Sequence, residues 1–95
     1  MSIFCKVHDE KILACADESL IGKTFSKGEL EIKISEIFYK DFKVDEKKLV
    51  KLLKGFDNIN LIGKKVVGIA IKENLVNKEK IKKIDGKPMA IICRV

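Results

Sequence analysis

The residues Gly22-Lys23-Thr24 have the composition of the end of a phosphate-binding P-loop. In a P-loop, backbone N–H groups and the lysine hold the phosphates, and this needs another glycine five residues before the Gly-Lys pair. Asp17 stands at that position, where its carboxylate would repel a phosphate. We therefore expect a surface turn rather than a nucleotide site.

The one histidine, His8, is followed by Asp9 and Glu10, and such side chains can transfer protons or bind metals. Neighbours on one turn rarely converge on an ion, because a metal site draws its ligands from several elements. The other acidic pair, Asp17 and Glu18, would need a low-dielectric cleft for acid–base catalysis, and the sequence indicates none. We expect no catalytic residue, no metal and no cofactor.

Three cysteines, Cys5, Cys15 and Cys93, form no CxxC pair. An odd number of cysteines without such a pair argues against a disulfide framework and against a standard zinc site. Each cysteine lies in an apolar segment, where thiols are usually buried and unreactive. We expect three reduced, buried, structural cysteines.

Charge is divided unevenly along the chain. Residues 1–46 carry 7 lysines against 10 acids, a net charge of −3, whereas residues 47–95 carry 12 lysines and Arg94 against 4 acids, a net charge of +9. A basic half of this kind attracts phosphate groups or an acidic protein surface.

Lysines of the basic half are the candidates for contacts with RNA phosphates. Phe38, Tyr39 and Phe42 are the candidates for base stacking, and of these only Tyr39 has a polar end suited to exposure. The lysines are Lys47, Lys51, Lys54, Lys64, Lys65, Lys82 and Lys83. Because bidentate contacts to guanine or phosphate are made by arginine, recognition through lysine would depend on backbone and shape. Two alternatives remain: a merely solvated basic face, and the Lys/Glu-rich composition reported for hyperthermophile proteins.

The N-terminal residues predict a hairpin. Strands over 3–7 and 12–16 flank a polar turn, and a turn centred on Glu10 places Cys5 opposite Cys15 and Val7 opposite Leu13. A loop is expected over 17–28. Alternation of apolar and polar residues over 29–35 then predicts a strand buried on one face.

The clearest helix is expected after Asp45, which can cap it, and before Gly55, which can end it. Val44 can pack on Leu49 as a hydrophobic staple. Residues 60–74 fit either a strand or a helix capped by Asn60, and the length favours the helix. Residues 80–84 and 89–95 flank a turn over 85–88 and predict a closing hairpin.

These elements predict an α+β fold in a single compact domain over 1–95. Their order is β-β-β-α-α-β-β, with a mainly antiparallel sheet and two helices. The apolar runs fall far short of the roughly 20 residues that span a bilayer, so no membrane partner is expected. The N-terminus lacks the features of a secretory signal, which favours a cytoplasmic chain that begins at Met1.

Short motifs along the chain resemble those of the archaeal domain-of-unknown-function family 424. They are Asp-x-x-Leu-Ile-Gly-Lys over 17–23, Phe38-Tyr39, Asn60-Leu61-Ile62-Gly63 and Ile84-Asp85-Gly86 with Pro88. The matching residues of unknown role are Asp17, Gly22, Lys23, Phe38, Tyr39, Asn60 and Gly63. The resemblance implies a free-standing archaeal cytoplasmic protein and names no substrate. Lys40-Asp41 stands where the family pattern implies a glycine turn.

Three hypotheses for function follow, in order of preference. The first is a non-catalytic accessory module that meets RNA or a ribonucleoprotein through the basic C-terminal half. The second is a protein-interaction module, or a homodimer, that docks an acidic or apolar partner through a sheet edge or an apolar patch. The third is a small enzyme that uses the loop 17–23.

Overall fold

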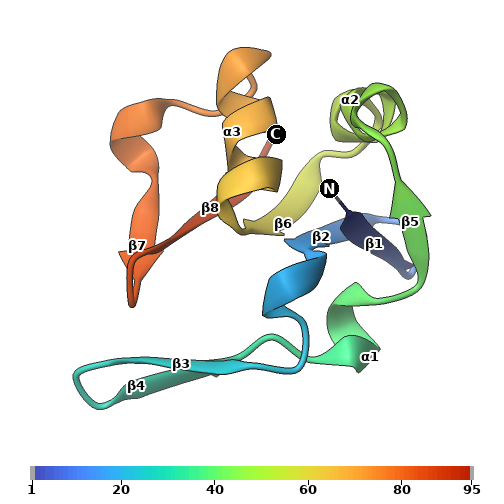
Figure 1. The fold of residues 1–95 in the computed structure, drawn as a ribbon. Helices are drawn as coiled ribbons and strands as arrows, with labels where there is room; N and C mark the ends of the chain where they lie inside the picture. The colour runs from blue at the N-terminus through green and yellow to red at the C-terminus, as the bar shows by residue number, and fades with distance from the viewer. Residues whose placement is uncertain (1, 95) are drawn as a thin grey trace.

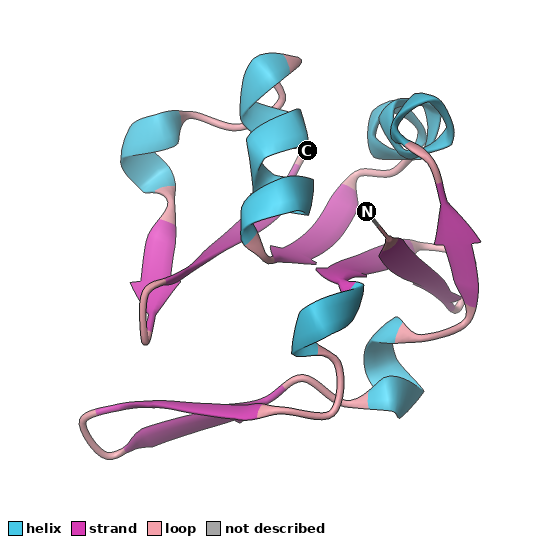
Figure 2. Cartoon of the chain, viewed as in Figure 1, coloured by secondary structure: helices cyan, strands magenta, loops and turns pink. Residues whose placement is uncertain are grey.

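The computed structural model describes residues 2–94, which form one α+β domain around a six-stranded sheet (Figures 1 and 2). The strand order is β5-β1-β2-β6-β8-β7. Its strands are β1 Ile3–His8, β2 Ile12–Asp17, β5 Phe42–Val44, β6 Asn58–Ile62, β7 Lys82–Ile84 and β8 Lys87–Cys93. Only β2 and β6 are parallel, so the predicted class and the mainly antiparallel sheet are confirmed.

Two helices cover one face of this sheet, α2 Glu46–Gly55 and α3 Lys64–Lys72. A separate two-stranded ribbon lies on the other side together with the short helix α1 Glu36–Tyr39 (Figure 1). The ribbon consists of β3 Thr24–Lys27 and β4 Leu30–Lys33. Short 3₁₀ helices span Glu18–Leu20 and Lys78–Lys80. Within residues 2–94, no helix combines the length and apolar character of a membrane crossing.

The N-terminal hairpin has the predicted register. Cys5 lies opposite Cys15 and Val7 opposite Leu13. At the turn, Asp9 and Glu10 both take positive φ angles of 52° and 60°, the left-handed region in which short polar residues are tolerated best.

Helix α2 begins and ends where its capping residues predict. The Asp45 carboxylate accepts a hydrogen bond from the Lys48 backbone N–H at 2.8 Å, and Gly55 is the last helical residue. Leu49 and Leu53 are fully buried, which seats the helix on the sheet. Val44 and Leu49 share one buried cluster, as a hydrophobic staple requires.

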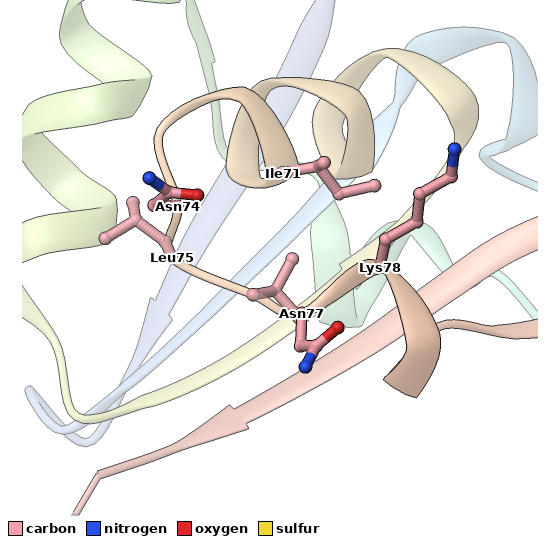
Figure 3. A pocket seen from close by; sticks show the side chains of 6 residues that line it. Ile71, Asn74, Leu75, Asn77 and Lys78 are labelled. Carbon is pink, nitrogen blue, oxygen red and sulfur yellow. The ribbon is translucent and has the colours of Figure 1, made fainter.

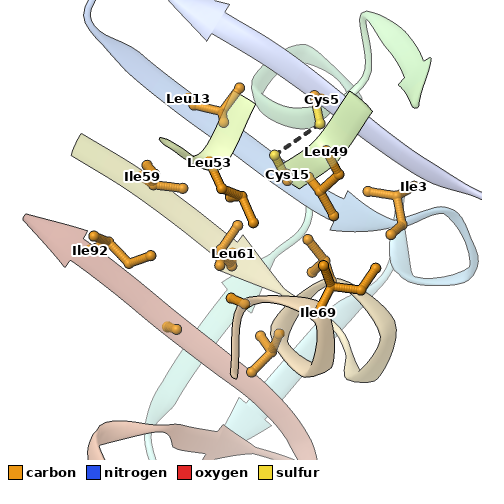
Figure 4. Packing of buried hydrophobic residues seen from close by; sticks show 14 of the residues in the cluster. Ile3, Cys5, Leu13, Cys15, Leu49, Leu53, Ile59, Leu61, Ile69 and Ile92 are labelled. Atoms are coloured by element: carbon orange, nitrogen blue, oxygen red, sulfur yellow. Dashed lines mark hydrogen bonds between the residues drawn. The ribbon is translucent and has the colours of Figure 1, made fainter. Parts of the chain in front are cut away.

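The main core lies between these helices and the sheet (Figure 4). Alternate strand residues point toward the helices, because successive side chains of a strand project to opposite faces. The sheet supplies Cys5, Leu13, Cys15, Ile59, Leu61 and Ile92, and the helices supply Leu49, Leu53, Val66, Val67 and Ile69. A second cluster, which includes Ala14, Phe25, Ile34 and Tyr39, fills the opposite face beneath the ribbon.

The helix predicted over residues 60–74 is confirmed for Lys64–Lys72 and wrong for the residues before it. The segment begins as the end of strand β6, and the helix starts only at Lys64. Asn60 pairs with Ala14 on one side and Ile91 on the other, so it is a strand residue and not a cap. The sheet pairing of Ile59 and Leu61, both 1% exposed, outweighs local helix propensity here.

Residues 17–33 also differ from expectation. The expected loop contains strand β3, and the strand expected over 29–35 pairs with it in the ribbon instead of joining the main sheet. Leu30 is 55% exposed, whereas Ile34 is fully buried beyond the end of β4. Helix α1 and strand β5 were not predicted, because neither exceeds four residues.

The closing hairpin is confirmed with a shorter turn than predicted. Ile84 pairs with Lys87, which leaves Asp85 and Gly86 as the two turn residues. Their φ angles of 49° and 76° suit a two-residue hairpin turn of the kind that Asp-Gly favours.

Candidate functional site

Three lysines converge on a hollow of about 350 Å³ between α3 and the closing hairpin. Lys64 begins α3, Lys78 belongs to the second 3₁₀ helix and Lys83 lies on β7; we call them the α3–β7 lysines. The remaining lining is apolar or glycine, from Val67, Gly68, Ile71, Ile81 and Pro88. Among residues 2–94, no acidic side chain lines this hollow, so the charged groups of its lining are all positive.

A neighbouring hollow of about 410 Å³ lies beyond the C-terminal end of α3. It is lined by Ile71, Asn74, Leu75, Val76, Asn77 and Lys78. Figure 3 shows the Lys78 amine pointing along α3, away from Asn74 and Leu75. Lys78 thus borders both hollows, and the second one adds amide groups but no further charge.

A second lysine group lies on α2. Lys47 and Lys51 line a shallow hollow with Asp45 and Lys48, and Lys54 follows one turn later on the exposed surface. The spacing of four and three residues places Lys47, Lys51 and Lys54 on one face of the helix. We call these three the α2 lysines.

The candidate lysines form no ion pair with any residue in the part of the chain that the structure describes. Within residues 2–94, the ion pairs join Lys40 to Glu36, Lys43 to Glu18 and Lys72 to Glu46. Neither the α2 lysines nor the α3–β7 lysines take part in one. Their charges are therefore available to an external anion.

The predicted lysines do not form one patch, because β7 points its two lysines to opposite faces of the sheet. Lys83 belongs to the α3–β7 lysines, whereas Lys82 lines a different hollow of about 460 Å³ with Lys80. Lys65 is exposed next to Lys64, at the helix position seven residues before Lys72, whose amine contacts Glu46 of α2. It therefore lies on the side of α3 that faces α2.

The hollow that contains Lys82 is largely apolar. It lies between the ribbon and the closing hairpin and is lined by Leu30, Ile32, Lys80, Lys82, Ile84, Met89 and Ile91. Ile91 is 67% exposed and Leu30 55%, so two large aliphatic side chains are exposed at the same hollow. We call it the Ile91 hollow.

Tyr39 is only 6% exposed, so the expectation that it stacks on RNA bases is wrong. It belongs to the second core cluster, and burial, with a smaller contribution from Cys15, raises the pKa of its hydroxyl above the ordinary value of 10.0. Phe38 is the exposed neighbour, and its ring stacks on His8 with centroids 4.5 Å apart. Lys40 has a φ of −105°, so no glycine is required after Tyr39.

Asp17 is the one buried charged residue within the described range, and it caps helix α3. Its carboxylate accepts hydrogen bonds from the backbone N–H groups of Lys65 at 2.9 Å and Val66 at 3.0 Å. Gly63 provides the space, because a Cβ there would overlap the Asp17 carboxylate. The positive end of the helix is thereby occupied by a carboxylate of the protein itself, and sequence reasoning missed this role.

The Gly22-Lys23-Thr24 segment is a turn. Gly22 has a φ of 88°, its N–H donates to the Ile34 carbonyl, and the Lys23 carbonyl accepts from the Ile34 N–H. Thr24 then begins strand β3, whereas a P-loop leads into a helix. Both ends of the loop 17–23 therefore have structural roles, since Asp17 caps α3 and Gly22-Lys23 form the turn before β3.

The thiols agree only partly with expectation. Cys5 and Cys15 are buried, but Cys93, the last residue of β8, is exposed. His8 Nε2 lies 2.9 Å from the Phe38 carbonyl oxygen. Within residues 2–94, no three His, Cys, Asp or Glu side chains are grouped as a metal site.

Comparison with known proteins supports the fold. A family model described as "Protein of unknown function (DUF424)" matches residues 5–95. The chain is similar to the solved structure titled "Crystal structure of an uncharacterized conserved protein from Methanopyrus kandleri", with a TM-score of 0.79 and 20% sequence identity over 100% of this chain and 96% of that one. At that identity the likeness shows the fold alone. None of the curated proteins compared with the chain matches it.

Proposed function

Because the chain belongs to the DUF424 family of proteins of unknown function, we propose a function from its own geometry: it is a non-catalytic accessory module that binds RNA or a ribonucleoprotein through its basic C-terminal half. The observation that carries this proposal is the convergence of the α3–β7 lysines on one hollow without an acidic side chain. The α2 lysines extend the contact. We further propose an archaeal, cytoplasmic protein, as the resemblance of its motifs to the family implies.

Lysine contacts of this kind favour recognition of the phosphate backbone. Each lysine that neutralises a phosphate releases counterions, so log affinity falls linearly with log salt concentration, by about 0.7 to 0.9 units per contact. Lysine acts as a point charge, whereas base-specific forks require arginine or amide side chains. Tyr39 is excluded from base stacking by burial, and the exposed Phe38 ring already stacks on His8, so shape and charge are the main means of recognition.

The test compares two triple variants that remove the same charge. Lys64→Gln/Lys78→Gln/Lys83→Gln changes the α3–β7 lysines, and Lys11→Gln/Lys23→Gln/Lys33→Gln changes three exposed lysines of the acidic half. Fluorescence anisotropy with generic single- and double-stranded RNA over a salt series should show a slope shallower by roughly two to three units in the first variant only. Equal slopes in both variants, or no binding by the wild type at low salt, would contradict the proposal.

A second candidate function rests on the Ile91 hollow. Monomeric proteins rarely leave large aliphatic side chains gathered and exposed without a partner, and this hollow has two of them on an otherwise apolar floor. The lysines at its edge, Lys80 and Lys82, suit an acidic partner surface. This candidate is a protein-interaction module or homodimer that buries the Ile91 hollow.

A further inference from the structure

Cys5 and Cys15 form a close pair of thiols on the second and third strands of the sheet. They are cross-strand neighbours on β1 and β2, both are 0% exposed, and their Sγ atoms lie 2.9 Å apart (Figure 4). Neither cysteine lies among the α2 lysines or the α3–β7 lysines, and neither lines the Ile91 hollow.

The hydrogen-bond pattern of the hairpin places Cys5 and Cys15 at a position where the Cα atoms of the two strands lie close together. The Glu18 N–H donates to the Ser2 carbonyl, so that pair is hydrogen-bonded, and hydrogen-bonded and non-hydrogen-bonded pairs alternate along an antiparallel ladder. Three steps further, Cys5 and Cys15 are therefore a non-hydrogen-bonded pair.

The opposite side of β1 gives the same result independently. The Cys5 carbonyl accepts a hydrogen bond from the N–H of Asp41, the residue before β5, so the backbone polar groups of Cys5 point away from β2. At a non-hydrogen-bonded pair the Cα atoms are about 4.5 Å apart, at the short end of the range of about 4.4 to 6.8 Å that a disulfide spans.

From this geometry we propose that Cys5 and Cys15 are a modification site, at which a low-molecular-weight disulfide reversibly oxidises the two thiols to a cross-strand disulfide. One cysteine thiolate attacks a sulfur of the reagent, forms a mixed disulfide and releases the first thiolate. The second cysteine then attacks its partner's Sγ and releases the second thiolate, which takes up a proton as the first one does. Two thiols are oxidised and one disulfide reagent is reduced to two thiols.

Cys5 is the first to react, because only the three-residue strand β5 separates β1 from the sheet edge. Cys15 lies one strand further in, and its contact with Cys5, together with burial, raises the pKa of its thiol. Oxidation of the folded protein is therefore slow and follows local opening of β5. Cys93 cannot compete for the pair, because it projects from the opposite face of the sheet to Cys15.

The experiment uses Cys93→Ser protein to remove the exposed thiol. One sample of this protein is incubated in the folded state, and a parallel sample is refolded from guanidinium. Both samples use the same glutathione redox buffer, which is oxidising enough to convert dithiothreitol to its disulfide. After acid quenching, intact mass should fall by two hydrogens, about 2 Da, with no glutathione retained. Peptide mapping should join the segments that contain Cys5 and Cys15. The Cys5→Ser/Cys93→Ser and Cys15→Ser/Cys93→Ser controls should give only a glutathione adduct.

Thermal unfolding supplies a second readout. The oxidised protein should melt several degrees higher than the reduced protein, because a cross-link restricts the unfolded chain. Two free thiols or glutathione adducts in both the folded and the refolded Cys93→Ser samples would overturn the proposal, as would a disulfide that lowers the melting temperature.

Discussion

The Asp17 carboxylate occupies the space that a side chain at residue 63 would fill. Gly63 also has a φ of 123°, a backbone conformation that residues with a Cβ rarely adopt. Two residues from distant parts of the sequence thus depend on each other, since the glycine lets the carboxylate reach the first turn of α3. This dependence gives both family-motif residues a structural role.

Alanine at residue 63 should therefore be costly. Gly63→Ala combines backbone strain with displacement of the Asp17 cap, and we expect it to lower the free energy of unfolding by about 2–4 kcal/mol. Gly68→Ala, inside the same helix with nothing within 4 Å of the new methyl group, should raise it by about 0.5–1 kcal/mol. Guanidinium melts of the two variants measure both changes.

A double-mutant cycle tests the contact itself. Asp17→Ala removes the cap and also the group that a Cβ at residue 63 would meet. The double variant Asp17→Ala/Gly63→Ala should therefore lose at least about 1 kcal/mol less than the two single losses combined. Strict additivity would mean that Gly63 is needed only for its backbone conformation.

Tyr39 provides a spectroscopic probe, because it is the one tyrosine of the chain. Burial raises its pKa above the ordinary 10.0, so the folded protein holds this proton more tightly than the unfolded chain does. The contribution to stability is complete below about pH 10 and is lost as pH rises through the folded-state pKa. Titration of tyrosinate absorbance should show ionisation above pH 10, coupled to unfolding.

The Tyr39→Phe variant is the control for that titration. It keeps the buried ring, so any loss of stability above pH 10 that comes from Tyr39 should disappear. An unchanged alkaline transition in this variant would assign the loss to other groups. Ionisation of Tyr39 at an ordinary pKa in the folded protein would contradict its burial.

At the scale of elements, capping and turn residues predicted the ends of helices and strands better than helix and strand propensity did. The Asp45 cap fixed the start of α2, and Asp85-Gly86 predicted the closing hairpin, because both signals act between near neighbours in sequence. Strand β6 could not be separated from α3 in this way. The cap of α3 comes from Asp17, on a different strand, and no local pattern around residues 60–64 contains that information.

The lysine groups of the candidate site, like the secondary-structure elements, could be predicted from the sequence only in part. Sequence indicated which half of the chain is basic, but not that alternation along β7 divides Lys82 from Lys83. Lys78 was missed as a candidate because its position depends on the turn that follows α3. Tyr39 was misplaced since its polar end suggested exposure, whereas the packing of α1 against β1 and β2 buries it.

The α2 lysines allow a prediction at this scale. Lys47→Gln/Lys51→Gln/Lys54→Gln keeps helix propensity nearly constant and leaves Leu49 and Leu53 untouched, so the free energy of unfolding should change by less than about 0.5 kcal/mol. If α2 extends the RNA contact, the salt slope should become shallower by up to roughly two to three units. An unchanged slope would confine the proposed interface to the α3–β7 lysines.

At the scale of the whole molecule, the two candidate functions use opposite faces of one sheet. The α3–β7 lysines line a hollow against α3, and the α2 lysines lie on α2, whereas the Ile91 hollow is lined by Leu30 and Ile32 of the β3–β4 ribbon. The helices α2 and α3 and this ribbon lie on opposite sides of the sheet (Figure 1). The six-stranded sheet stands between them. Mutations on one face should therefore leave the other face intact, because sites without shared contacts act nearly independently.

Ile91→Gln is the variant that separates the two functions. Since Ile91 is 67% exposed, the variant with a neutral polar side chain of similar length should fold normally, and its net charge stays at +6. We expect this variant to bind generic RNA with the wild-type affinity and salt slope. Sedimentation velocity over a concentration series provides the second measurement. If the wild type self-associates and Ile91→Gln does not, the Ile91 hollow is an interface between copies of the chain. If Ile91→Gln weakens RNA binding as much as the α3–β7 variant does, RNA binding requires that association.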